Sequence, residues 1–151
     1  MTNQQLSIKS YSTLLSHLKQ VFIQGMQRIE EEKVRTYWRT GELISKYLLA
    51  HKERADYGTN LYDKLSEDLE IERSTLLRAV QFYRTYPILA RGRELTWSHY
   101  RLLITIKDKT KRRRLEEQAA SKDWDSIRLQ EVLRLDQLKI EPPKIKAITV
   151  K

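Results

Sequence analysis

Residues 65–80 read Leu65-Ser-Glu-Asp-Leu-Glu-Ile-Glu-Arg-Ser-Thr-Leu-Leu-Arg-Ala-Val80. The apolar residues are spaced as in two short helices joined by a turn of about three to four residues. The stretch therefore predicts a helix-turn-helix at about residues 61–86, with Ser74 as the N-cap of its second helix and Pro87 ending that helix. We expect six side chains to pack the two helices together, namely Leu65, Leu69, Ile71, Leu76, Ala79 and Val80.

The second helix of this pair has a polar outer face. Its first turns would be free to enter a major groove, and the segment resembles the DNA-binding helix-turn-helix of small phage repressors. Arginine can bind guanine or phosphate, serine can reach either, and glutamine suits adenine or the backbone. The candidate DNA-binding residues of this segment are Arg73, Ser74, Thr75, Arg78, Gln81 and Arg84.

Two residues of the same segment favour other interpretations. Leu77 is apolar at a position where a base-reading side chain is normally polar, so a protein partner could contact it. Glu70 stands where such turns usually have glycine, which costs about 1 kcal/mol if the residue must be left-handed. The alternative to DNA binding is a helical hairpin that serves packing alone.

Charge is the strongest feature of the composition. The 151 residues include 29 Lys and Arg against 20 Asp and Glu, a net charge of +9. A surplus of this size attracts polyanions, so we expect nucleic acid as a partner, with double-stranded DNA as the leading candidate. The densest run, residues 107–114, suits phosphate contacts, although a charge run is also typical of a solvated face. The further candidate residues are Arg91, Arg93, Lys107, Lys109, Lys111, Arg112, Arg113 and Arg114.

The rest of the chain has a helical pattern. Only four Gly and three Pro occur, which favours long regular elements. Apolar residues between Tyr11 and Leu48 predict one bent helix of about 40 residues, or two helices broken near Gly25 or Glu30-Glu-Glu. We expect an all-α fold: a long N-terminal helix or helix pair, then the helix-turn-helix, then a small C-terminal helical bundle.

The predicted organisation has three parts. Residues 1–10 form a flexible N-terminus, residues 11–140 the helical domain, and residues 141–151 a tail with the character of a linker. Within the domain, Tyr57-Gly58 is expected to end a helix or form a turn. Later helices should begin after Thr96, at Asp108, and after Asp125 or Ser126, and the three tryptophans should anchor the core.

Several function classes receive no support. The chain has no Cys, which removes disulfides, thiol catalysis and cysteine-ligated metals, and its three His are not spaced as a helical metal pair. We find no catalytic constellation and expect no enzyme activity, no metal and no cofactor. No apolar run approaches the roughly 20 residues of a membrane span and no secretory signal opens the sequence, so we expect a cytoplasmic protein.

A series of short motifs resembles a known family. Their order and spacing are similar to those of the N-terminal domain of YhcG-like proteins, domain of unknown function 1016, over about two-thirds of the chain. The motifs are Tyr37-Trp38-Arg-Thr-Gly41-Glu-Leu-Ile44, Ala55-Asp-Tyr57-Gly58, Leu65-Ser66, Phe82-Tyr83, Leu95-Thr-Trp97-Ser98-His99, and Trp124 followed by Leu129. The resemblance implies a helical domain thought to bind DNA and typically joined to a C-terminal PD-(D/E)XK nuclease domain.

The sequence departs from this family pattern in two places. The link between Leu69 and Ser74 is shorter than the glycine-rich link of many members, and nothing after Leu135 supplies the Asp and Glu-x-Lys of a nuclease site. We therefore expect a non-catalytic DNA-binding domain that is the targeting part of a nuclease-associated system, with the nuclease on a separate polypeptide or a longer parent chain. The alternative is an interaction or dimerisation module that docks a partner nuclease, because the apolar stripe of residues 11–48 could form a helical homodimer.

Overall fold

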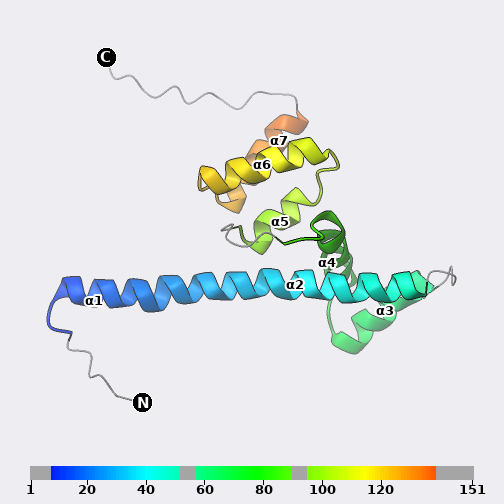
Figure 1. Ribbon diagram of the computed structural model, residues 1–151, viewed down its shortest axis with the longest axis horizontal. Coiled ribbons are helices and arrows are strands. Elements are labelled where there is room, and N and C mark those ends of the chain that lie inside the picture. Colours follow the sequence, from blue (N-terminus) through cyan, green and yellow to red (C-terminus); the bar gives the residue numbers. More distant parts are fainter. Residues whose placement is uncertain (1–7, 52–56, 90–94, 139–151) are drawn as a thin grey trace.

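The computed structural model describes residues 8–51, 57–89 and 95–138, and this part of the chain is helical with no strand. One helix runs from Tyr11 to Ala50, 40 residues without a break, and five shorter helices follow it (Figure 1). The all-α prediction is confirmed, and the N-terminal stripe is one helix rather than two. The segments are α1 (Tyr11–Leu18), a π-helical turn η1 (Lys19–Ile23), α2 (Gln24–Ala50), α3 (Tyr57–Leu69), α4 (Arg73–Thr85), α5 (Trp97–Leu103), α6 (Lys109–Ser121) and α7 (Ser126–Gln137).

Most helix starts were predictable because a short polar side chain caps them. Ser10 accepts a hydrogen bond from the backbone N–H of Thr13, at 3.2 Å, and Asp125 accepts one from that of Arg128, at 2.7 Å. Asp108 caps α6 in the same way, with bonds from the first turn at 2.9 and 3.2 Å. These caps fix where the chain enters α1, α6 and α7.

Two predicted boundaries are wrong. Ser74 is not the N-cap of α4, because that helix begins at Arg73 and its N-cap is Glu72, two residues before Ser74. The side chain of Glu72 makes no cap hydrogen bond. Tyr57-Gly58 does not end a helix, because α3 begins at Tyr57. Ser74 thus lies inside α4, and Tyr57-Gly58 lies at the start of a helix rather than at its end.

The main core lies where α2, α4, α5, α6 and α7 meet. Phe82, Leu103 and Leu129 are fully buried at its centre. Trp97 is buried beside Phe82 and stacks on Tyr37 of α2, with ring centroids 4.2 Å apart. The three tryptophans all belong to this core, Trp97 buried and Trp38 and Trp124 partly buried, as predicted.

A smaller core joins the helix-turn-helix to the end of α2. It consists of Ile44, Tyr62, Leu76 and Val80. Two of the six side chains predicted to pack the helix-turn-helix do not take part, because Leu69 and Ile71 are exposed. The reason is that α4 packs mainly against α2, so that its contact with α3 is short and the end of α3 and the following turn stay in solvent.

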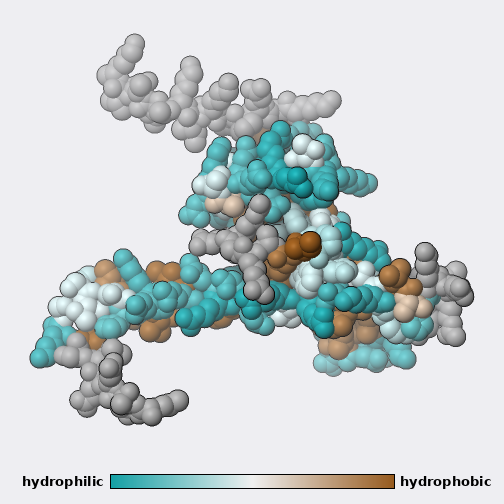
Figure 2. Space-filling model, viewed as in Figure 1, coloured by the Kyte–Doolittle hydropathy of each residue, from teal (hydrophilic) through white to brown (hydrophobic). Residues whose placement is uncertain are grey.

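The first half of the long helix extends away from these cores as an arm, residues 11–33 (Figure 1). No residue of α1 or η1 is buried, and the first buried residue of α2 is Val34. Apolar side chains nevertheless lie along the arm, visible as brown patches on its surface (Figure 2). The arm is therefore an amphipathic helix whose apolar side chains the described chain does not cover.

Candidate nucleic-acid interface

The turn of the helix-turn-helix is tight and has one residue in a left-handed conformation. Glu70 has a φ of 56°, so the strain expected of a non-glycine residue at this position is present. The turn is closed by Ser66, whose hydroxyl donates to the carbonyl oxygen of Ile71 at 2.6 Å and whose carbonyl oxygen accepts from the Ile71 N–H at 3.3 Å. These bonds fix the start of α4 relative to α3.

Helix α4 has a buried face and an exposed face. Its buried face is apolar and contributes to both cores, through Leu76, Ala79, Val80 and Phe82. Its exposed face begins with Arg73 and Ser74 and continues with Leu77, which is 41% exposed. The first turns of α4 thus present one cation, one hydroxyl and one apolar side chain to solvent.

The guanidinium of Arg73 is paired within the helix-turn-helix. Its Nε lies 3.1 Å from a carboxylate oxygen of Asp63 on α3. The two side chains remain 47% and 65% exposed, so water screens the pair and it stabilises the fold by little. If Arg73 exchanged the carboxylate of Asp63 for a phosphate oxygen, the protein would therefore lose little free energy of folding.

The remaining α4 candidates differ in whether their side chains are buried or bonded to other parts of the protein. Gln81 donates a hydrogen bond from Nε2 to the carbonyl oxygen of Ile104 at 2.8 Å. Ile104 is the C-cap of α5, so this bond satisfies a carbonyl group at the end of that helix. Arg84 donates from Nε to the hydroxyl of Ser45 on α2 at 3.3 Å. Thr75 and Arg78 are partly buried. Only the first turns of α4 therefore keep the geometry expected of a groove-reading helix.

The basic run around α6 divides into internal and exposed cations. Lys111 forms an ion pair with Asp136 of α7. Arg112 donates to the carbonyl oxygen of Ile106 at 2.7 Å and lies over the ring of Tyr86, 5.9 Å from its centroid. Both side chains therefore stabilise the C-terminal bundle.

The other four cations of this run, Lys107, Lys109, Arg113 and Arg114, are exposed. Three of them lie around an open hollow of about 470 Å³ on the surface of α6, which is lined by Lys109, Thr110, Arg113, Arg114 and Glu117. Three cations against one carboxylate give this surface a net positive charge. Arg91 and Arg93 lie outside the described residues.

Tyr86 links the helix-turn-helix to the basic bundle. Its carbonyl oxygen accepts from the indole N–H of Trp38 at 2.7 Å, and its ring contacts Phe82 and Tyr100 edge-on. Burial raises the pKa of its hydroxyl well above the usual value, the nearby charge of Glu116 raises that pKa further, and Arg112 partly offsets both effects. The neutral phenol is thus favoured at the junction of α2, α4, α5 and α6.

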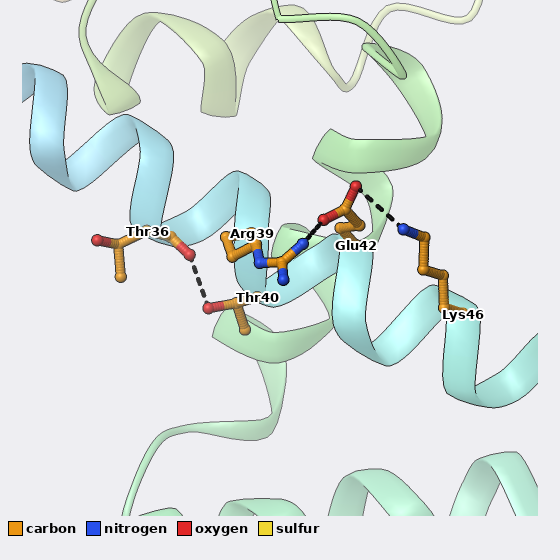
Figure 3. A network of polar contacts seen from close by, with 5 residues as sticks. All are labelled: Thr36, Arg39, Thr40, Glu42 and Lys46. Atoms are coloured by element: carbon orange, nitrogen blue, oxygen red, sulfur yellow. Dashed lines mark hydrogen bonds and ion pairs between the residues drawn. The ribbon is translucent and has the colours of Figure 1, made fainter.

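A polar network on α2 was not apparent from the sequence. Glu42 pairs with Arg39 and with Lys46, the latter at 3.4 Å, and the hydroxyl of Thr40 donates to the carbonyl oxygen of Thr36 at 2.7 Å (Figure 3). Although desolvation raises the pKa of Glu42, the hydrogen bond from Arg39 and the two positive charges lower it below its ordinary value. One carboxylate is thus shared by two cations on this side of α2.

His99 has a structural position. It forms a capping box with Thr96 at the start of α5, and its Nε2 lies 2.6 Å from the carbonyl oxygen of Trp124. These bonds fix the start of α5 against the segment that precedes α7. Within residues 8–51, 57–89 and 95–138, no three His, Cys, Asp or Glu side chains come together as a metal site. No helix in these same ranges is long and apolar enough to cross a membrane.

Comparison with known families gives one result. The family model of the DUF1016 N-terminal domain matches residues 13–138, which include every described helix except the first two residues of α1. Comparisons with curated proteins and with solved structures found no match. The match spans most of the 151 residues. The chain therefore belongs to the DUF1016 N-terminal domain family.

Proposed function

We propose that this chain is a non-catalytic DNA-binding domain whose helix-turn-helix, α3 and α4, contacts the major groove of duplex DNA. The observation that carries the proposal is the exposed start of α4, with Arg73, Ser74 and Leu77 on the face opposite the buried Leu76 and Ala79. Arginine and serine there can contact base edges or phosphates, and a leucine can contact a thymine methyl group.

The exposed cations of α6 would hold the DNA backbone. Lys109, Arg113 and Arg114 lie together on one helix surface, and each phosphate that they neutralise releases counterions. Gln81, Arg84, Lys111 and Arg112 have internal partners and are weaker candidates for DNA contacts. The net charge of +9 would attract DNA at long range.

The test is a titration of the whole chain against a labelled duplex at two salt concentrations. Wild type should bind with an affinity that falls steeply with salt, and Arg73→Ala/Arg78→Ala should weaken binding by about tenfold or more. Lys33→Ala/Arg35→Ala is the matched control, because it removes the same charge from exposed positions of α2. Equal losses in the two variants, or preferential binding of duplex RNA, would reject DNA recognition through α4.

A second role is favoured by the arm. An interaction or dimerisation module, able to dock a partner nuclease, would use an apolar helical surface of this kind. The two roles are compatible, since helix-turn-helix proteins commonly bind DNA as dimers. An association role predicts that glutamate substitutions on the arm abolish association while the monomer keeps its fold.

A further inference from the structure

The arm exposes far more apolar surface than a free helix in water normally does. Nine large apolar side chains between residues 11 and 29 are exposed, and Val21 and Phe22 are 75% and 67% exposed. Monomeric proteins rarely expose contiguous apolar patches larger than a few hundred Å². The nine are Tyr11, Leu14, Leu15, Leu18, Val21, Phe22, Ile23, Met26 and Ile29.

The exposed area is that of a stable interface. With about 150–200 Å² for a large apolar residue, the nine side chains together expose on the order of 800 Å². A specific complex of standard size buries about this area on each partner. A single face of the arm presents only part of this area, so the arm could supply one side of an interface smaller than the standard size.

The spacing of six of these nine residues is unchanged when the direction of the helix is reversed. The six lie at intervals of three, four, four, four and three residues: Tyr11, Leu14, Leu18, Phe22, Met26 and Ile29. A second copy running antiparallel, and centred on Gln20, places each of the six opposite another of the six. An interface between identical surfaces related by a two-fold axis has this self-complementary character.

The charges favour the same orientation. Three consecutive carboxylates, Glu30, Glu31 and Glu32, lie at one end of the arm, and Lys9 lies just beyond the other end. In the antiparallel register Glu31 of one copy lies opposite Lys9 of the other. A parallel pair in register would instead bring the two acidic runs together, which costs free energy through repulsion between like charges.

We propose that residues 11–29 of two copies of this chain pair as antiparallel helices centred on Gln20, with Leu14 of each chain near the partner's Met26. The π-helical turn η1 lies at the centre of this pair. The inference goes beyond DNA binding and does not depend on it, because a single domain still carries α4.

Sedimentation equilibrium of the whole chain tests the inference. Wild type should be a dimer, and Leu18→Glu/Phe22→Glu should raise the dissociation constant by about 100-fold or more while the helix content by circular dichroism stays unchanged. Leu49→Glu/Ile127→Glu, at exposed apolar positions of α2 and α7 beyond the arm, is the matched control and should remain dimeric. A monomeric wild type, or equal loss in both variants, overturns the inference.

Cross-linking tests the orientation. The chain has no cysteine, so single cysteines can be introduced without background. When Leu14→Cys and Met26→Cys chains are mixed and treated with a short bismaleimide, the antiparallel pair should give a cross-link between a Leu14→Cys chain and a Met26→Cys chain. A parallel pair would instead give cross-links only between two Leu14→Cys chains or between two Met26→Cys chains. Binding of the monomeric arm variant to a short duplex, measured separately, shows whether DNA recognition survives a failure of the dimer.

Discussion

Gly41 of α2 lies directly against Ala79 of α4, and the two helices cross at this point. A Cβ atom on Gly41 would overlap the carbonyl oxygen of Ala79 and come within 3.0 Å of the Cβ of Tyr83. The overlapping atoms include backbone, which cannot move aside as a flexible side chain would. The crossing of α2 and α4, and with it the orientation of the helix-turn-helix, therefore requires glycine here.

Gly41→Ala should destabilise the protein by about 3 kcal/mol, because the two helices must separate or bend to accommodate the methyl group. Gly25 is the matched control, since a Cβ there would meet nothing within 4 Å and alanine favours a helix interior by roughly 0.5–1 kcal/mol. Urea unfolding followed by circular dichroism measures both. Similar effects of the two substitutions would contradict the close crossing.

Glu70→Gly should stabilise the protein by about 1 kcal/mol, because glycine adopts the left-handed conformation of this residue without a steric penalty. Glu67→Gly, an exposed position inside α3, should instead destabilise it by roughly the same amount. Thermal unfolding of the two variants distinguishes the outcomes. A loss of stability in both would show that the turn does not need a positive φ.

Arg112→Ala should lower stability by about 1–2 kcal/mol, since it removes the hydrogen bond to Ile106 and the contact with the Tyr86 ring. Arg113→Ala/Arg114→Ala should change stability by less than about 0.5 kcal/mol, because both side chains are exposed. The double variant should instead reduce the salt dependence of DNA binding, by up to about two in the logarithmic slope. Unfolding and binding titrations on the same samples separate the two roles.

Tyr86→Phe should make stability less sensitive to alkaline pH. Because the pKa of Tyr86 is raised in the folded protein, its contribution to stability is complete below its usual pKa of 10.0 and is lost as pH rises toward the folded-state value. Wild type should therefore lose stability above about pH 10, and the variant should lose less. Urea midpoints across this range, with Tyr11→Phe as the matched exposed control, measure the difference. Identical slopes for wild type and Tyr86→Phe would contradict burial of the hydroxyl.

Local sequence signals predicted most of the fold. Helical spacing and polar caps are properties of a few neighbouring residues, so the helix starts at Thr96 and Asp125 were recoverable. The same local signals were misleading at Ser74, which lies inside α4, and at Tyr57-Gly58, which begins α3 instead of ending a helix.

The partners of the candidate site residues were not predictable. Gln81 bonds to Ile104 and Arg84 to Ser45 across 23 and 39 residues of sequence, and such pairings arise only once the helices pack. A polar residue on an outward position of one helix can thus be engaged by another element. The apolar stripe of the arm had the opposite outcome: its pattern is that of a buried helix face, yet the described part of the chain buries no residue between 11 and 33.

The unbroken helix from Tyr11 to Ala50 would set the distance between the two domains of a dimer. In the antiparallel pair, the Gly41 positions of the two copies stand about 60 Å apart along the shared axis, at 1.5 Å per residue. Two turns of B-form DNA measure about 70 Å. If both proposals hold, the length of the arm would set the separation of the two half-sites that a pair of these domains binds, and lengthening the arm would lengthen the preferred spacing.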